Sequence, residues 1–530
     1  MISKFNKKLA LVIVVVALLP VLPSLIAVLS PVAVLILVFA GIAGFSPLRR
    51  FAFGIVGGIA DIVSSILTGL GRGLGLSLGW LFTGGEKSAK FMGRFEQARL
   101  LGRRNQGILI DGKSSRLSEN ASYESVLIQG GMGRGKTSTY VVPNLLLPPA
   151  HLPSFVVTDT SGEIYQNTSG YLERRGYQVR VLNLMDPSRS ETYNPLAKAK
   201  SPQQIAELAK TLVRSSSGRS GQMANDPFWE QAAEKLIRIM AQCLHNQPDA
   251  QYRNLANLRH LITGFDAHVA PNGQLGKIDD FVLAATRSDQ STYQAYKAFV
   301  QGNLKTIQSV LMSADVAMDP VATPEMAALT ATNSFDFDEL RQQPAVIYVV
   351  VNQTQMELYA FLLNLFYADL FRSLLRNQKN PGKPVYLFLD EFGHLSIPGF
   401  EVFGTTARKY KVAFTLFLQS MAQLDSRYGA LGARTIQEAL ATEIYLPGMA
   451  LDTARSLEAR LGRTAKAPLM AANDLIRMKD NEALLLQSNN LPVILKTKRY
   501  FQRADLRRRS SLSPAQLPNA PGGQPPVIKL

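Results

Sequence analysis

Residues 130–137 constrain the fold more than any other part of this 530-residue chain. They read GGMGRGKT and fit the phosphate-loop pattern G-x-x-x-x-G-K-[ST] completely. The apolar run 125–128 precedes them, and a stretch able to start a helix follows, which is the strand–loop–helix context that such a loop needs. Glycine is required because the loop must turn back tightly and bring its backbone N–H groups to the phosphates. The sequence therefore predicts a bound nucleoside triphosphate.

The last two residues of this loop have specific expected contacts. Lys136 is expected to bridge the β and γ phosphates, and the Thr137 hydroxyl is expected to bind Mg²⁺. The helix that follows points the positive end of its dipole at the same anion. The predicted nucleotide-binding residues are Gly130, Gly131, Met132, Gly133, Arg134, Gly135, Lys136, Thr137 and Ser138.

A pair of acids supplies the second half of the predicted site. Residues 385–391 read VYLFLDE, a buried-strand pattern that ends in Asp390 and Glu391. Because ligands bind at the carboxyl edge of an open α/β sheet, both carboxylates are expected beside the phosphate loop. We expect Asp390 to hold Mg²⁺ through water, since this ion dehydrates reluctantly, and Glu391 to activate the attacking water. The second acid favours hydrolysis over slow switching.

Two further candidates surround the next apolar run. Gln419 ends KVAFTLFLQ, where RecA-like motors place a polar residue that senses the γ-phosphate, and a solvated loop residue is the alternative. Arg408 and Lys409 lie between the acids and Gln419. Either could act as an arginine finger across a subunit interface and stabilise transition-state charge. The alternative for both is an ordinary solvated surface.

Short β-rich runs recur along the chain, with helix-like segments between them. Near-continuous apolar strands separated by helices indicate a parallel sheet covered on both faces, and hence an α/β fold with crossover connections. The predicted strands are 125–128, 154–158, 178–184, 345–351, 385–389, 412–418, 442–446 and 483–487.

Helical periodicity dominates residues 201–330 instead. Ser201–Pro202 and Asp226–Pro227 are helix start signals. The second is followed by apolar residues at spacings of three or four, namely Phe228, Ala232, Leu236, Ile239 and Cys243. We therefore predict an all-α domain at 201–330 inserted into the α/β core, which is formed by 98–200 and 331–509. The long gap between Thr137 and Asp390 then has an explanation.

Two other segments carry compositional signals. Residues 215–221, SSSGRSG, are expected to form a flexible loop. The tail at 510–530 is rich in proline, glycine and serine and is expected to be disordered.

The N-terminus predicts a membrane anchor. No residue from Leu9 to Leu48 is charged. This uncharged stretch is too long for a signal-peptide core, and as a helix it could cross a bilayer about twice. Basic residues on both sides of this stretch place both ends in the cytoplasm by the positive-inside rule, and this favours a transmembrane hairpin within 1–50. The mostly apolar segment 51–71 is an alternative second span. Residues 51–97 are then a juxtamembrane linker. The basic residues gathered at 87–104 are expected to face anionic lipid, with DNA contact as the alternative.

The net charge of +17 favours anionic partners, either nucleic acid or the inner face of a membrane. The only cysteine, Cys243, excludes a disulfide framework within one chain and favours a reduced, intracellular compartment. Five scattered histidines and one cysteine show no structural zinc pattern.

Taken together, the motifs resemble the coupling proteins of type IV secretion and bacterial conjugation. The resemblance covers roughly 100–500 together with the two-span anchor. It rests on GGMGRGKT at 130–137, TDTSGE at 158–163, YNPL at 193–196, DPFWEQAAEKLI at 226–237, FLDEFGHL at 388–395, and Gln419–Ser420 with Arg427–Tyr428–Gly429 downstream. One departure is Ser161, which stands where many members carry the lysine of D-x-K-G-E, so Asp159 and Glu163 are assigned only loosely.

The resemblance implies a RecA-like nucleotide-binding domain, an inserted all-α domain that receives substrate, a ring of six subunits, and ATP with Mg²⁺ as ligands. It also implies a multi-pass protein of the bacterial inner membrane, with most of the chain in the cytoplasm. Three functions stay open. The first is an ATPase that delivers DNA–relaxase substrate to the secretion channel, reading no DNA sequence. The second is recruitment of protein effectors, and the third is a docking scaffold without turnover, which the acid pair disfavours.

Overall fold

The computed structural model describes residues 89–102, 104–217, 227–266, 276–519 and 525–530. The chain divides into two units, Met1–Ser88 and Ala89–Leu530, and every described residue belongs to the second. The predicted hairpin in 1–50, the alternative span 51–71 and most of the linker 51–97 lie outside the described residues. In the described ranges, no helix is both long enough and apolar enough to cross a bilayer.

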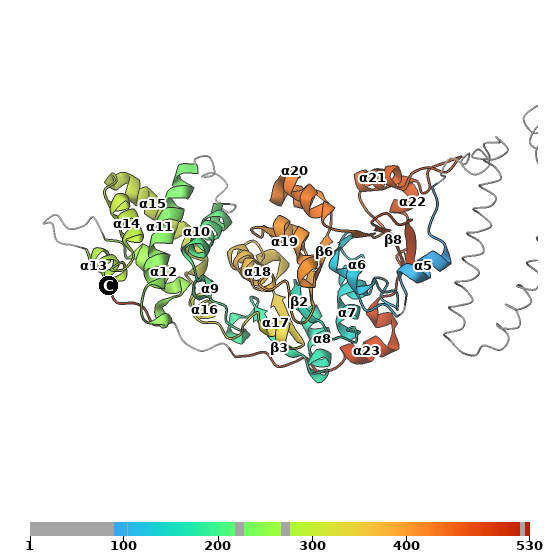
Figure 1. The fold of residues 1–530 in the computed structure, drawn as a ribbon, viewed down its shortest axis with the longest axis horizontal. Coiled ribbons are helices and arrows are strands. Elements are labelled where there is room, and N and C mark those ends of the chain that lie inside the picture. The colour runs from blue at the N-terminus through green and yellow to red at the C-terminus, as the bar shows by residue number, and fades with distance from the viewer. Residues whose placement is uncertain (1–88, 103, 218–226, 267–275, 520–524) are drawn as a thin grey trace, which may run out of the picture. The chain divides into compact units, whose positions relative to one another are not determined.

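A nine-stranded mixed sheet runs through Ala89–Leu530, in the order β3-β4-β2-β5-β6-β1-β7-β8-β9 (Figure 1). Strands β1 to β7 pair in parallel, whereas β8 and β9 are antiparallel additions at one edge. The strands are β1 (Val126–Gln129), β2 (Ser154–Asp159), β3 (Gln178–Asn183), β4 (Ala345–Val350), β5 (Val385–Leu389), β6 (Val412–Leu418), β7 (Thr442–Tyr445), β8 (Glu482–Gln487) and β9 (Val493–Lys496).

This topology confirms the α/β class and corrects one detail. The eight predicted strands are all present, but the strand predicted at 483–487 is antiparallel to both of its neighbours, β7 and β9. The segment 488–492 between β8 and β9 is too short for the crossover that a parallel pair needs. Strand β9 was not predicted, because its four residues are too few to show a period.

Helices cover both faces of the sheet. Because successive side chains of a strand point to opposite faces, Leu387 and Leu389 of β5 belong to one apolar core, and Tyr386 and Phe388 belong to the other. The first core includes side chains of α18 (Ala360–Leu374) and α19 (Phe400–Thr406), and the second includes those of α7 (Val142–Leu146) and α8 (Glu163–Arg174). Burial of every β5 residue is typical of a parallel strand covered on both sides.

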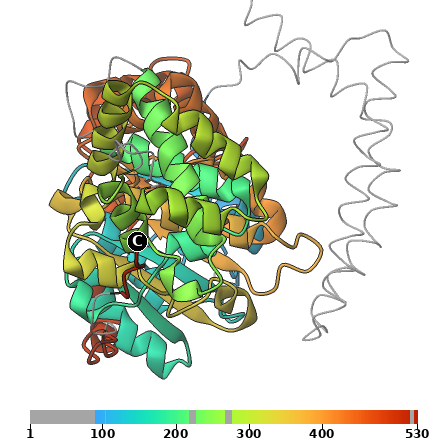
Figure 2. The ribbon, with the colours of Figure 1, turned by 90° about the vertical axis from the view of Figure 1, so that its left-hand side faces the viewer.

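Helices α10 to α16 lie in the chain between β3 and β4, and Figure 2 shows them in green gathered into one bundle. Helix α11 begins at Pro227, as its start signal predicts, and buries Leu236, Ile239 and Cys243. Phe228, assigned to the same face, is 53% exposed. The helices are α10 (Pro202–Ser217), α11 (Pro227–His245), α12 (Leu255–Thr263), α13 (Lys277–Ala285), α14 (Gln290–Val300), α15 (Leu304–Met318) and α16 (Pro324–Leu329). Because α10 continues to Ser217, the loop predicted at 215–221 is wrong for its first residues.

Two connecting segments, 190–198 and 330–339, join this bundle to the sheet, and together they are called the neck here. Hydrogen bonds hold the two segments together, and the YNPL residues take part in them. Two of them are Asn194 N to Asn333 Oδ1 (2.9 Å) and Ser334 N to Thr192 O (3.2 Å), and Tyr193 N donates to the carbonyl of Leu329, the last residue of α16, at 2.9 Å.

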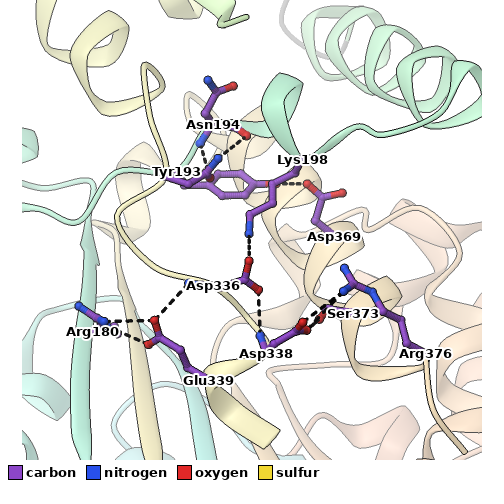
Figure 3. Close-up of polar contacts among 11 residues, drawn as sticks. Arg180, Tyr193, Asn194, Lys198, Asp336, Asp338, Glu339, Asp369, Ser373 and Arg376 are labelled. Atoms are coloured by element: carbon purple, nitrogen blue, oxygen red, sulfur yellow. Dashed lines mark hydrogen bonds and ion pairs between the residues drawn. The ribbon is translucent and has the colours of Figure 1, made fainter. Parts of the chain in front are cut away.

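Ion pairs tie the neck to the sheet and to itself (Figure 3). Arg180 of β3 forms two hydrogen bonds to the Glu339 carboxylate, at 3.1 and 3.2 Å. Lys198 Nζ lies 2.9 Å from Asp336 Oδ2 across the neck. Bidentate pairing fixes orientation as well as distance, so the bundle and strand β3 are coupled through a defined geometry.

Asn194 is the buried centre of the neck. Its Nδ2 donates to the carbonyls of Arg253 and Ala331, both at 2.8 Å, and its Oδ1 accepts from Ala197 N at 3.0 Å. We expect Asn194→Ala to lower the free energy of unfolding by about 2–4 kcal/mol, since a helix cap is lost and two carbonyls lose their donor. Urea titration measures the change. The exposed Asn490→Ala is the matched control, expected within about 0.5 kcal/mol of wild type.

The prediction of a disordered tail at 510–530 is corrected for 510–519 and 525–530, and residues 520–524 lie outside the described residues. Ala515 N donates to Ser169 Oγ of α8 at 3.1 Å, and a Cβ at Gly170 would lie 1.8 Å from the Ser513 carbonyl. Further on, the buried Asn257 of α12 accepts from Ile528 N at 2.8 Å and donates to the Pro526 carbonyl at 3.0 Å. Proline-rich composition disfavours helix and sheet interior, but it does not prevent an extended chain from docking on side-chain partners.

Candidate nucleotide site

The predicted phosphate loop connects β1 to a π-helical turn, Thr137–Val141, that continues into α7. Gly133 and Gly135 have φ of 70° and 87°, a backbone region that side-chain-bearing residues rarely adopt. The Lys136 side chain is buried, and its Nζ donates to the Gly130 carbonyl at 2.8 Å. The Lys136 ammonium therefore lies against the backbone of the phosphate loop itself.

Not every residue of the loop faces inward. Arg134 forms an exposed ion pair with Asp480, with Nη1 to Oδ1 at 3.1 Å, and Met132 is 70% exposed. These two positions can contribute backbone N–H groups to a phosphate while their side chains lie elsewhere.

The structure brings the two predicted halves of the site together. Sheet order places β5 two strands from β1, so Asp390 follows β5 beside the loop that follows β1. Thr137 Oγ1 donates to Asp390 Oδ2 at 3.2 Å, and Lys136 Nζ lies 4.0 Å from Glu391 Oε1. A hydroxyl and a carboxylate oxygen are hard ligands that suit Mg²⁺, so this pair of residues fits the metal that the sequence predicts.

Burial, followed by the negative charge of Glu391, raises the pKa of Asp390 to about 6. Because the pKa of this carboxyl is higher in the folded chain than in the unfolded chain, the folded protein loses stability as the pH rises from about 4 through 6. Without Mg²⁺ and nucleotide, we expect Asp390→Asn to be more stable than wild type by about 1–3 kcal/mol at pH 8, and about equal at pH 4. Urea unfolding at the two pH values measures this, and equal stability at pH 8 would contradict the raised pKa.

The Glu391 carboxylate accepts hydrogen bonds from Gln419 and lies near His394. The Glu391 backbone is left-handed, with φ of 51°. Gln419 Nε2 lies 3.3 and 3.2 Å from the two carboxylate oxygens, and His394 Nε2 lies 3.9 Å from Oε2. Gln419 itself is fixed, because its backbone N donates to Gln423 Oε1 at 3.0 Å. In this structure Gln419 therefore contacts the predicted general base.

Arg408 is not brought to this site within one chain. It lies in a 3-10 turn, Ala407–Tyr410, that leads into the start of β6, at the sheet edge opposite the phosphate loop. Its Nη1 lies 2.6 Å from Glu124 Oε1, and its side chain is 60% exposed. Lys409 belongs to the same turn. A role for either across a subunit interface stays a prediction.

Asp159 and Glu163 differ in position. Asp159 is buried and accepts from the backbone N of Gly162 and of Tyr165, both at 2.8 Å, so it shapes the turn before α8. Glu163, together with Thr160 and Asn167, lines a cavity of about 410 Å³ that also contains the phosphate loop and both acids.

Among the residues of this cavity that were not predicted are Arg499, Tyr500 and Phe501. They follow β9 in the 3-10 turn Tyr500–Gln502 and its start. The sequence signal was an aromatic pair between basic residues, KRYFQR, but without strand β9 nothing indicated that it reaches the phosphate loop.

Comparison with known proteins gives three findings. The family model described as Type IV secretory system Conjugative DNA transfer matches residues 90–467. The chain is 22% identical over 432 residues to the probable conjugal transfer protein TraG of Sinorhizobium fredii (strain NBRC 101917 / NGR234), which covers 75% of this chain and 65% of the relative. It is 23% identical over 418 residues to protein VirD4 of Agrobacterium fabrum (strain C58 / ATCC 33970), and this match covers 71% of this chain and 58% of the relative. The chain thus spans less than two thirds of the length of these relatives.

Among solved structures, the plasmid coupling protein TrwB in complex with ADP and Mg²⁺ superposes with a TM-score of 0.58. The sequence identity is 14%, and the match covers 78% of this chain and 94% of TrwB. Identity this low shows a shared fold alone, which is the α/β phosphate-loop architecture described above.

Proposed function

The chain belongs to the type IV secretory system conjugative DNA transfer family, and from this membership we propose that it is an ATP-hydrolysing coupling protein. It recruits DNA–relaxase substrate and drives it toward a type IV secretion channel. The observation that carries the proposal is the contact of Thr137 with Asp390 at 3.2 Å beside the buried Lys136. TrwB has been solved with ADP and Mg²⁺ and with a non-hydrolysable ATP analogue, which supports ATP and Mg²⁺ as ligands here.

The residues divide the work of hydrolysis. When nucleotide binds, Lys136 Nζ leaves the Gly130 carbonyl and contacts the β and γ phosphates instead. The backbone N–H groups of the loop bind the same phosphate oxygens. Thr137, and Asp390 through water, would hold Mg²⁺, and the ion would supply neutralisation of the charge that develops on the phosphates. Glu391 orients the attacking water and accepts its proton, while Gln419 and His394 keep the carboxylate in place. Gln419 is thereby able to report the state of the γ-phosphate.

The family likeness supports a proposal for assembly and location. We place six copies in a ring, anchored in the bacterial inner membrane through the predicted hairpin within 1–50, with 51–71 as the alternative second span. In such a ring the exposed Arg408 serves as the arginine finger of the neighbouring site. The helical domain at 201–330 provides the docking region for substrate, inserted into the nucleotide-binding domain formed by 98–200 and 331–509.

DNA is favoured as cargo by the net charge of +17. The full chain in detergent should hydrolyse ATP only with Mg²⁺, and DNA of any sequence should stimulate it. DNA affinity should fall about 10³-fold or more between 50 and 200 mM salt, if six or more phosphates are contacted. Hydrolysis that is indifferent to DNA but stimulated by effector proteins would replace the cargo assignment. Nucleotide binding without turnover under every condition would overturn the proposal in favour of a docking scaffold.

A further inference from the structure

We propose that the turn after β9 binds the nucleoside half of the nucleotide: Phe501 stacks on the base, and Arg499 binds the phosphates nearest to it. This inference rests on the proposed function, because it extends the same cavity. It adds to the proposed ATPase site the residues that would hold the base and the phosphates nearest to the base, which a bare polyphosphate would use only in part.

Strand directions bring the turn to the phosphate loop. Strand β8 is antiparallel to β7 and β9 is antiparallel to β8, so β9 runs in the same direction as β7 and β1. Residues that leave β9 therefore emerge at the same edge of the sheet as the phosphate loop.

The turn after β9 also lies on the side of the phosphate loop that is opposite the two acids. In the sheet order, β5 lies on one side of β1, and β7, β8 and β9 lie on the other. The acids that follow β5 mark where the γ-phosphate is attacked. Residues 499–501 approach the loop from the opposite flank, which is where the rest of the nucleotide must extend.

Arg499 is positioned on the loop and has no competing partner. Its Nε lies 3.1 Å from the place that a Cβ on Gly135 would occupy. Within the described part of the chain, its guanidinium forms neither an ion pair nor a hydrogen bond. Nearby arginines differ: Arg503 pairs with Asp505 at 2.7 Å, and Arg509 donates to the Leu146 carbonyl at 2.6 Å. A guanidinium left available beside a phosphate loop suits an anionic ligand.

Phe501 provides an open aromatic surface on a fixed support. Phe501 is 45% exposed, and its ring stands edge-on to that of Tyr500, with centroids 5.5 Å apart and planes at 78°. Tyr500 packs against Val142, Leu146 and Leu506, which anchors the turn on α7 and on α23 (Ala504–Ser510). Figure 1 shows α23 beside α7 and α8. A half-exposed ring inside a polar cavity is a stacking platform, and it accepts any base because every base has a π-face.

Calorimetry tests the assignment. The full chain, in buffer that contains Mg²⁺, is titrated with ADP, with GDP and with inorganic tripolyphosphate. Phe501→Ala should weaken ADP and GDP binding alike, by about 5- to 100-fold, because one base stack is lost. It should leave tripolyphosphate affinity unchanged, and Phe501→Tyr should restore nucleotide binding. Arg499→Ala should weaken all three ligands. Phe95→Ala is the matched control, since that ring is exposed but does not line the cavity.

The outcomes separate the inference from the function on which it rests. Wild-type protein that binds ADP, together with Phe501→Ala protein that binds it equally well, overturns the inference and leaves the ATPase proposal standing. Equal losses of ADP and tripolyphosphate in Phe501→Ala also overturn it, because the ring would then support the loop and not the base. Wild-type protein that binds none of the three probes removes the proposed function itself.

Discussion

Lys136→Ala is expected to lower kcat for ATP hydrolysis by at least about 100-fold, the usual cost of removing one charged group aimed at transition-state charge. The lysine is buried, and its ammonium lies against the loop at 2.8 Å from the Gly130 carbonyl. Alanine cannot reach the γ-phosphate, and burial of the site keeps solvent cations from taking its place. Steady-state phosphate release with saturating Mg²⁺ and ATP measures the loss.

Two comparisons give this result its meaning. Lys466→Ala removes an exposed lysine outside the cavity, so it should leave kcat within about 2-fold of wild type. If Lys136→Ala protein that unfolds at the wild-type urea concentration hydrolysed ATP within about 3-fold of wild type, the assignment of the phosphate loop would be wrong.

Glu391→Gln is expected to lower kcat by about 10²- to 10⁴-fold while nucleotide binding is retained, because a general base is lost and the shape of the side chain is kept. The glutamine can still accept a hydrogen bond from Gln419, now 3.2 Å from the carboxylate. Single-turnover hydrolysis together with calorimetric binding of ADP separates the two effects. Parallel losses of affinity and turnover would instead indicate that Glu391 holds the fold of the site.

The exposed Glu438→Gln is the matched control for that substitution. Glu438 forms an ion pair with Arg434 along one helix at 3.0 Å, and both side chains are largely in water. Such pairs contribute little, so turnover should stay at the wild-type level.

Local patterns predicted the centre of the site because its parts carry their own backbone and chemical requirements. The loop needs glycine at positions with positive φ, as at Gly133 and Gly135. The strand before Asp390 needs apolar residues in succession. Since parallel strands end at a common edge, the contact of Thr137 with Asp390 follows once both strands are recognised.

The parts that were missed depend on contacts between distant segments. Strand β9 has only four residues, and its edge position follows from pairing with β8 and not from a period. The docked tail depends on Asn257 and on the absence of a side chain at Gly170, neither of which is visible in the tail itself. The partner of Gln419 could not be predicted either, because it depends on the left-handed backbone that aims Glu391.

The neck has a mechanical consequence for coupling. It joins the helical bundle to β3 and β4 at the outer end of the sheet, where Arg180 of β3 is bonded to Glu339, and β2 and β5 come next in sheet order before β6 and β1. Asp390 follows β5, which lies nearer to β3 and β4 in sheet order than β1, the strand that precedes the phosphate loop. If the bundle receives substrate as proposed, we expect a displacement of the bundle to alter turnover before nucleotide affinity.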